Sequence, residues 1–216
     1  MNVAVLTPPL TGRKAHQALT NQRGVAIVMS ALGNWLRRNN TGPTIRALQG
    51  DIASQCVDVV VNAANERLGA GAGVAGAIIR AAGPGLLREC ADSYPDGCPT
   101  GEARVTGGHD LPAKWIVHTV GPRWGDGTNG EPELLADCYR NSLQTAAEIG
   151  ARTVAFPAIS TGIFHYPRED AARVAVSTIR EFFAQNGHEI NEVFLVAYDS
   201  EQLAIYERFL EAEEDS

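Results

Sequence analysis

The first 50 residues of this chain contain no aspartate or glutamate. All 25 acidic residues lie at Asp51 or beyond, whereas six of the 18 basic residues precede it. Residues 1–50 therefore carry a net charge of +6, and residues 51–216, with twelve basic and 25 acidic residues, carry −13. Phosphate contacts dominate the affinity of proteins for nucleic acid. The strongly negative charge of residues 51–216 therefore excludes general nucleic-acid binding. A phosphate-containing ligand would have to be held by backbone amides in a local pocket.

Long apolar runs are also missing, since none approaches the roughly 18 residues that a membrane-spanning helix needs. We therefore expect a soluble protein with no membrane partner. The four cysteines form no CxxC pair and no metal-like spacing with the five histidines, so neither a metal site nor a disulfide framework is predicted. Cys56 and Cys138 adjoin apolar stretches and are expected in the core. No secretory signal is seen, and a cytoplasmic location is expected.

Residues 1–42 differ from the rest of the chain, with prolines, scattered basic residues and no sustained hydrophobic period. A short amphipathic helix fits residues 26–38, ahead of helix-breaking residues at 39–43. An acid-poor, basic beginning can indicate an organelle transit peptide. The favoured alternatives are an appended segment that packs on the domain, or a start codon assigned too early, with Met29 as the true start.

From residue 43 to residue 211 the pattern is regular, and strands alternate with helices. Runs of β-branched and aromatic residues predict strands, while apolar residues at helical spacing predict helices. Such alternation implies one domain with a largely parallel, buried sheet covered on both faces, followed by an acidic tail at 212–216. The expected strands are 44–48, 57–61, 104–106, 115–120, 153–156 and 193–198, and the expected helices are 73–82, 134–149, 168–183 and 201–210.

Two loops follow the carboxyl ends of strands, where ligands of such folds bind: residues 62–73 and 157–166. The first runs into Gly71-Ala72-Gly73-Val74-Ala75-Gly76, which matches the dinucleotide-binding pattern G-x-G-x-x-G. Its context differs, because nine residues separate the pattern from the strand and no second strand with an acidic end follows. A Rossmann-type oxidoreductase is therefore a minor alternative, which absorbance changes with a nicotinamide cofactor would reveal.

The glycine-rich loop still indicates a phosphorylated ligand. It leads into a helix whose first turn presents free N–H groups and a positive dipole end to an anion. The segment Ser160-Thr161-Gly162-Ile163-Phe164 follows another strand and offers similar small, polar and glycine positions. Taken alone, this second segment is an ordinary turn. Two such loops at one edge of the sheet suit a diphosphate clamped between them.

Seven segments between about Thr44 and Leu210 carry motifs in a family-like order and spacing: Gly50-Asp51-Ile52, Val60-Val61-Asn62-Ala63-Ala64-Asn65, Arg80-Ala81-Ala82-Gly83-Pro84, Cys98-Pro99-Thr100-Gly101, Leu111-Pro112-Ala113-Lys114, His118-Thr119-Val120-Gly121-Pro122 and Phe156-Pro157-Ala158-Ile159-Ser160-Thr161-Gly162-Ile163-Phe164. This part of the chain resembles the macrodomain family, specifically the MacroD-type branch that includes bacterial O-acetyl-ADP-ribose deacetylases. The resemblance implies a three-layer α/β/α fold with a mixed, mostly parallel sheet, ADP-ribose as ligand and no cofactor. We expect a monomer.

The resemblance also implies how the adenine and diphosphate are bound. Asp51 would accept a hydrogen bond from the adenine amino group beside the Ile52 amide, and Tyr198 would stack on the ring. A surface aspartate and a half-buried core tyrosine are the ordinary alternatives. The diphosphate would lie between two sets of residues: Gly71, Gly73, Val74 and Ala75 on one side, and Ser160, Thr161, Gly162, Ile163 and Phe164 on the other.

By the same resemblance, the catalytic end consists of Asn65, Phe164 and Gly73. Asn65 would fix the distal ribose hydroxyls and the attacking water, and Phe164 would pack on that ribose. Asn62 is counted with the ligand-binding residues, although it could instead hold the backbone of its loop. His118 is interpreted as a structural core histidine, and His165 as an exposed loop residue.

Ala75 departs from the deacetylase branch, which typically reads Gly-Gly-Gly-Val-Asp-Gly at this place. Ala72 adds a methyl group, a modest change, whereas Ala75 removes a carboxylate proposed to orient or activate water. Loss of a general base typically costs about 10²–10⁴-fold in rate. Viral macrodomains carry the same Val-Ala-Gly and include hydrolases, for which the bound diphosphate is proposed to position the water.

Two functions therefore remain open. The first is hydrolysis of the ester that joins ADP-ribose to Asp or Glu of a modified protein, or removal of acetyl from O-acetyl-ADP-ribose. The second is a non-catalytic reader of ADP-ribosylated partners, which Ala72 and Ala75 favour.

Overall fold

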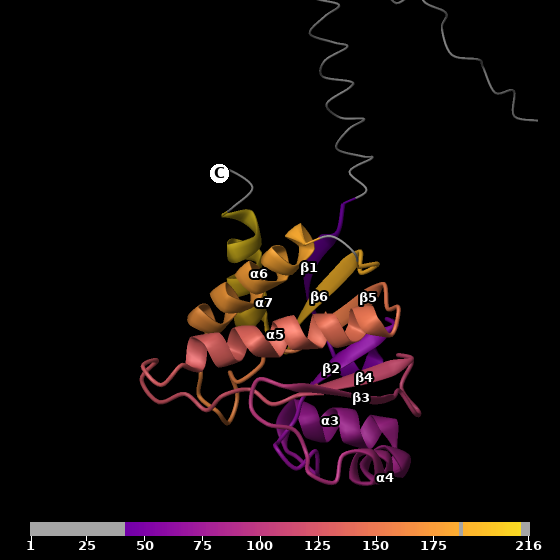
Figure 1. Cartoon of the computed structure of the whole chain (residues 1–216). Coiled ribbons are helices and arrows are strands. Elements are labelled where there is room, and N and C mark those ends of the chain that lie inside the picture. Colours follow the sequence, from indigo (N-terminus) through magenta and orange to yellow (C-terminus); the bar gives the residue numbers. More distant parts are fainter. Residues whose placement is uncertain (1–41, 186–187, 213–216) are drawn as a thin grey trace, which may run out of the picture. The chain divides into compact units, whose positions relative to one another are not determined.

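The computed structural model describes residues 42–185 and 188–212, in which a six-stranded sheet lies between two layers of helices (Figure 1). The residues proposed as the N-terminal helix, 26–38, and most of the acidic tail lie outside the described residues. The elements are β1 (Thr44–Gln49), a 3₁₀ turn η1 (Ile52–Ser54), β2 (Val59–Ala63), α3 (Gly73–Ala82), α4 (Pro84–Ser93), β3 (Ala103–Gly107), β4 (Trp115–Thr119), α5 (Glu131–Glu148), β5 (Thr153–Phe156), α6 (Arg168–Ala184), β6 (Glu192–Ala197) and α7 (Ser200–Glu211).

The strands run in the spatial order β1-β6-β5-β2-β4-β3. Every neighbouring pair is parallel except β3 with β4, which is antiparallel. The mixed, mostly parallel sheet expected from the sequence is therefore confirmed.

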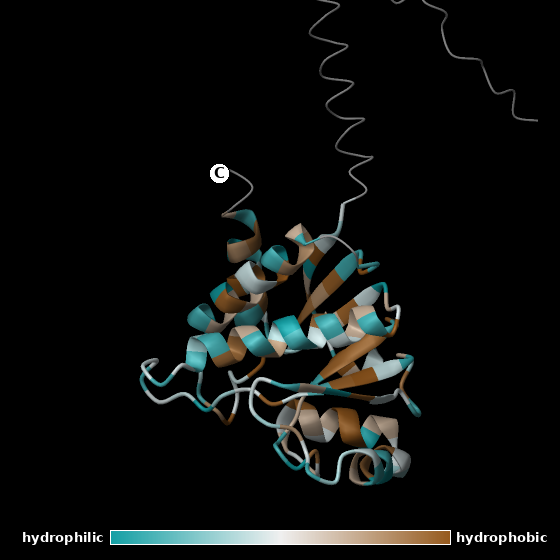
Figure 2. Ribbon diagram, viewed as in Figure 1, coloured by the Kyte–Doolittle hydropathy of each residue, from teal (hydrophilic) through white to brown (hydrophobic). Residues whose placement is uncertain are grey.

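The central strands are apolar on both faces because helices cover both. In β2, Val59 and Val61 pack in the cluster with α5, α6 and α7, whereas Val60 packs in the cluster with α3 and α4. Successive side chains of a strand point to opposite faces of the sheet, so they pack into two separate cores. Figure 2 shows the strands in the middle of the sheet as largely hydrophobic and the helices as mixed.

Helix α4 was not among the expected elements, because Gly83-Pro84-Gly85 has the composition of a loop. Pro84 instead occupies the first turn of α4, where its missing N–H is no loss and its fixed φ suits the helix. Gly83, with φ of +79°, separates α3 from α4. The two helices therefore cover one face of the sheet as a bent pair.

The expected core position of Cys56 is wrong. Cys56 is exposed, because β2 begins only at Val59 and residue 56 still belongs to the connection after η1. Cys138 is buried as expected, and so are Cys90 and Cys98. Burial raises the pKa of each of these three thiols to about 11, so they are protonated and poorly nucleophilic at neutral pH.

None of the helices within residues 42–185 and 188–212 combines the length and the apolar character needed to cross a bilayer.

Candidate functional site

The carboxyl ends of five parallel strands meet at one edge of the sheet. In spatial order, β1, β6, β5, β2 and β4 lead into the segments that carry Asp51, Tyr198, Ser160, Asn65 and Arg123. Residues far apart in sequence are thereby arranged along a single line. Ligands of open α/β sheets bind along this edge.

At the β1–β6 end of this line, Asp51 and Tyr198 follow strands that pair in register up to Gln49 and Ala197. One carboxylate oxygen of Asp51 accepts the N–H of Ala53 at 2.9 Å and so caps η1. The Tyr198 side chain is 90% exposed and is therefore not the half-buried core tyrosine weighed as an alternative. An aromatic ring this exposed is available to a planar ligand group.

Along the line lies a cavity of about 240 Å³ between the two loops singled out in the sequence. Asp51, Ile52, Asn62, Thr161 and Tyr198 are not part of its lining. The other expected ligand residues lie together in its wall. The lining consists of Ala63, Ala64, Asn65, Gly71, Ala72, Gly73, Val74, Ala75, Gly121, Arg123, Ala158, Ser160, Gly162, Ile163 and Phe164.

One wall of this cavity is the N-terminus of α3. The first N–H groups of a helix have no partner within it, and the N-cap residue Ala72 supplies no side-chain acceptor. Gly73 adopts a φ of +58°, which favours glycine. Gly76 lets the preceding loop lie on the helix, because a β-carbon there would be 2.6 Å from the carbonyl oxygen of Gly71. The wall therefore presents backbone donors and a positive helix end to the cavity.

The opposite wall is the turn after β5. The N–H of Tyr166 donates to the Ser160 carbonyl at 3.0 Å, and that of His165 donates to the Gly162 carbonyl at 2.9 Å. These bonds close the turn, while the N–H groups of Gly162, Ile163 and Phe164 find no acceptor in the described part of the chain. His165 is exposed, as expected from the sequence.

Ser160 has two features that suit a ligand contact. Its backbone lies in the left-handed region, with φ of +65°, a conformation that costs energy for a residue with a β-carbon. Its hydroxyl is buried without a hydrogen-bond partner. Since buried polar groups are normally paired, this hydroxyl indicates a place for an acceptor such as a phosphate oxygen.

The Asn65 side chain holds its own loop together. Its Oδ1 accepts the N–H groups of Arg67 and Gly69, each at 3.1 Å. Its Nδ2 donates to the carbonyls of Gly69 and Ala70, at 3.2 and 3.1 Å. These four bonds use the full capacity of the amide, so a sugar hydroxyl could bond to it only by replacing one of them.

A second, larger cavity of about 540 Å³ adjoins the first. The sequence does not predict this cavity, because the two loops expected at the carboxyl ends of strands do not include the segment after β4, which lines it. The lining consists of Asn65, Glu66, Thr100, Val120, Gly121, Pro122, Arg123, Trp124, Gly125, Asn129, Glu131, Leu134 and Phe164.

The family model described as the Macro domain matches residues 61–175, just over half of the chain. The chain belongs to the macrodomain family. It is 50% identical over 174 residues to the O-acetyl-ADP-ribose deacetylase of Escherichia coli strain K12, an alignment that covers 79% of this chain and 97% of that protein.

Two solved macrodomains have a similar structure. That of Oceanobacillus iheyensis with ADP has a TM-score of 0.76 and 38% identity, over 82% of this chain and 94% of that chain. That of Trypanosoma brucei in complex with ADP-ribose has a TM-score of 0.71 and 39% identity, over 76% of this chain and 68% of that chain. These likenesses confirm the three-layer fold expected from the sequence.

Asn62 lies apart from the lining of the smaller cavity. It is buried in β2, where its Nδ2 donates to Nδ1 of His118 at 3.1 Å, and it does not bond to the loop backbone through its side chain. Strand alternation explains this, because residues 62 and 63 of β2 face opposite sides of the sheet. Holding the loop is the task of Asn65 instead.

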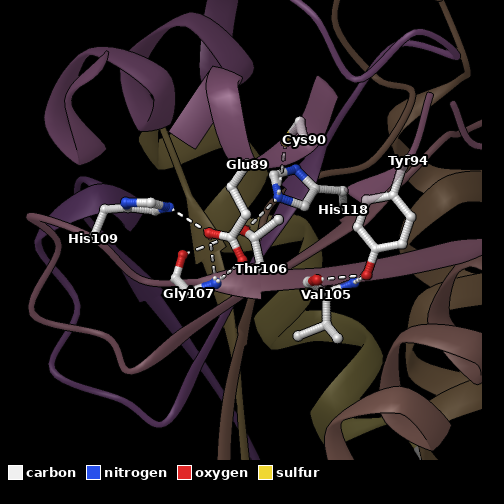
Figure 3. A network of polar contacts seen from close by, with 8 residues as sticks. All are labelled: Glu89, Cys90, Tyr94, Val105, Thr106, Gly107, His109 and His118. Atoms are coloured by element: carbon white, nitrogen blue, oxygen red, sulfur yellow. Dashed lines mark hydrogen bonds and ion pairs between the residues drawn. The ribbon is translucent and has the colours of Figure 1, made fainter. Parts of the chain in front are cut away.

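His118 is structural, in agreement with its interpretation from the sequence. Figure 3 shows its ring against Thr106 and Cys90, and its Nε2 lies 2.9 Å from the Thr106 hydroxyl. Burial lowers the pKa of His118 to about 4, so the ring is neutral at pH 7. Nearby, Glu89 accepts from Gly107 and pairs with His109 at 2.6 Å, which ties α4 to β3.

Proposed function

We propose that this macrodomain binds ADP-ribose and hydrolyses its esters. The substrates are proteins mono-ADP-ribosylated on Asp or Glu, and O-acetyl-ADP-ribose. The observation that carries this proposal is the cavity between the N-terminus of α3 and the turn at Ser160–Phe164, where backbone donors face each other across about 240 Å³.

The order of residues along the sheet edge matches the order of groups in ADP-ribose. Adenine stacks on Tyr198 and bonds to the free oxygen of Asp51 at the β1–β6 end. The diphosphate lies between the two loops and accepts from their amides and from the Ser160 hydroxyl. The distal ribose then reaches Asn65 and Phe164, which line the far end of the cavity.

The reaction has to proceed without a carboxylate on α3. Ala75 is a buried residue of the cavity wall and carries no group that could accept a proton. The bound diphosphate therefore orients the water, while the loop amides hold the sugar in a reactive position, together with Asn65 once a sugar hydroxyl replaces one of its four loop bonds. Much of the barrier reduction can come from such positioning alone.

The activity of one relative and the bound ligand of another support this proposal. The Escherichia coli relative is a deacetylase of O-acetyl-ADP-ribose, and the Trypanosoma brucei neighbour was solved with ADP-ribose. Residues 43–211 form the catalytic unit in this proposal, with residues 1–42 and 212–216 as appended segments. The unit acts as a monomer on cytoplasmic substrates.

The test is release of free ADP-ribose from a Glu-linked mono-ADP-ribosylated protein by the wild type, Asn65→Ala and Ala75→Asp. We expect release by the wild type and its collapse in Asn65→Ala. Asn141→Ala is the matched control, because the Asn141 amide also holds a backbone carbonyl, that of Gly101, and neither residue lines either cavity.

Affinity for ADP-ribose and the melting temperature of each variant show whether a loss of release reflects misfolding. No release by the wild type, combined with tight ADP-ribose binding and activity in Ala75→Asp, would instead identify a reader built on the fold of an enzyme.

A further inference from the structure

The two cavities meet at four residues that line both of them: Asn65, Gly121, Arg123 and Phe164. In the proposed function the distal ribose occupies this junction. The group esterified to that ribose must then extend out of the smaller cavity. The larger cavity, of about 540 Å³, begins where the smaller one ends.

Arg123 brings a positive charge to the junction. Its guanidinium carbon lies 4.3 Å from the centre of the Phe164 ring, a cation–π contact that fixes the side chain at the boundary. Phe164 is held in turn by its carbonyl, which accepts the N–H of Trp124 at 2.9 Å. Within the described ranges, no carboxylate forms an ion pair with Arg123 and no acceptor bonds to it.

The buried carboxylate in the larger cavity is already engaged. Glu131 accepts the N–H groups of Gly125 at 3.1 Å and Asn129 at 2.7 Å. Its own backbone N–H and these neighbouring amides lower the pKa of Glu131, so it stays ionised in the first turn of α5. The Glu131 carboxylate is directed to these amides and forms no ion pair with Arg123, so the guanidinium keeps N–H donors for an external anion.

Resting on the proposed function, we infer that the larger cavity is the subsite for the acyl group of the ester and that Arg123 binds the carboxylate that leaves. The apolar side chains of Val120, Trp124 and Leu134 line it and suit the methylene stem of an aspartyl or glutamyl residue. Its volume falls in the range of about 300–1,000 Å³ that holds small-molecule ligands, well above what an acetyl group fills. The geometry therefore favours peptide esters over O-acetyl-ADP-ribose.

The charge of Arg123 contributes as the bond breaks. The oxygen of water bonds to C1″ of the distal ribose, and the bond from C1″ to the ester oxygen breaks with its electron pair on the carboxylate. The proton that the water loses passes to solvent. The ester is neutral and the departing carboxylate is anionic, so the guanidinium stabilises the transition state more than the ground state.

The first experiment measures kcat/KM for release of ADP-ribose from a Glu-linked ADP-ribosyl peptide. In Arg123→Gln we expect a fall of about 30-fold, the effect of losing one charge-assisted hydrogen bond, with the dissociation constant for ADP-ribose changed by less than about twofold. Arg123→Lys keeps the charge and should recover most of the rate. Arg88→Gln, which removes an exposed arginine of α4 outside both cavities, is the matched control.

A second experiment needs no turnover. Acetate, as a free carboxylate, should tighten ADP-ribose binding by wild type and by Arg88→Gln relative to chloride at equal ionic strength, and should not do so in Arg123→Gln. If the wild type releases nothing from any ester, the proposed hydrolysis fails, and this coupling still decides the role of Arg123.

Three results would overturn the inference. Arg123→Gln could weaken binding of ADP-ribose itself as much as it slows release, which would place the guanidinium on the diphosphate. Release could proceed at the wild-type rate in that variant. Acetate could leave the affinity of the wild type for ADP-ribose unchanged.

Discussion

Gly121 lies directly against the hydroxyl of Ser160: a β-carbon at position 121 would be 2.1 Å from that oxygen. The segment after β4 and the turn after β5 thus approach each other at a distance that only glycine permits. Both residues line the smaller cavity, so this contact joins two parts of its wall.

Gly121→Ala should therefore displace the turn that carries Ser160. We expect a loss of stability of about 1–3 kcal/mol, the usual cost of overpacking, together with weaker ADP-ribose binding. Urea unfolding and calorimetric titration measure the two effects. Gly107→Ala is the control, because a β-carbon there would meet only Glu89 Oε2, at an ordinary contact distance of 3.6 Å, and Gly107 lines neither cavity. Equal free energies of unfolding for Gly121→Ala and wild type would show that the turn carrying Ser160 can move without loss of stability.

Tyr198→Ala tests the adenine end of the site. Because the side chain is 90% exposed, the melting temperature should not change. Affinity for ADP-ribose should fall about tenfold, since a base stacked on an aromatic side chain is worth about 1–3 kcal/mol. Trp115→Ala removes another exposed aromatic side chain, at the amino end of β4 and so at the opposite edge of the sheet from Tyr198. This variant should bind ADP-ribose normally. An unaltered affinity in Tyr198→Ala would move adenine away from this residue.

His118 should make stability depend on pH in the acidic range. Burial lowers its pKa to about 4 in the folded protein, against an ordinary value of 6.5, so the unfolded chain binds more protons between these values. Stability therefore rises with pH across this window, and the contribution of His118 between pH 7 and pH 5 is about 2 kcal/mol. Urea unfolding at both pH values should show a smaller difference in His118→Gln. A difference as large as that of the wild type would assign the pH dependence to other groups.

Chelation should leave the reaction intact. The described portion of the chain holds no group of three or more His, Cys, Asp or Glu side chains arranged to bind a metal ion. ADP-ribose release measured with and without excess EDTA should therefore proceed at one rate. Strong inhibition that added zinc or magnesium reverses would require a different mechanism.

The sequence predicted most of the fold because its local signals agree with the tertiary structure. Thr153–Phe156, with β-branched and aromatic residues, and the small, apolar residues of Gly73–Ala82 form their elements with the expected bounds. Helix α4 could not be predicted in this way. Gly83-Pro84-Gly85 has loop composition, and only packing on α3 and β3 gives the segment a helical environment.

The candidate site was predictable where backbone chemistry creates it and not where distant side chains do. The two amide-rich loops follow from glycine positions and from the carboxyl-end rule. The pairing of Asn62 with His118 joins residues 56 positions apart, and nothing local distinguishes Asn62 from Asn65. Arg123 likewise becomes a candidate site residue only because its guanidinium lies over the ring of Phe164, which belongs to the turn after β5.

The strand order has a consequence for synthesis of the protein. Within the described sheet, β1 pairs with no strand other than β6, which is the last to be made. A ribosome that has released Thr44–Gln49 must therefore translate well over 100 further residues before Glu192–Ala197 can receive that strand. Until then the nascent chain carries an unpaired β-strand, which is exposed to aggregation and a natural target for chaperones. A ribosome-stalled chain that lacks β6 should for the same reason lack the proposed adenine site.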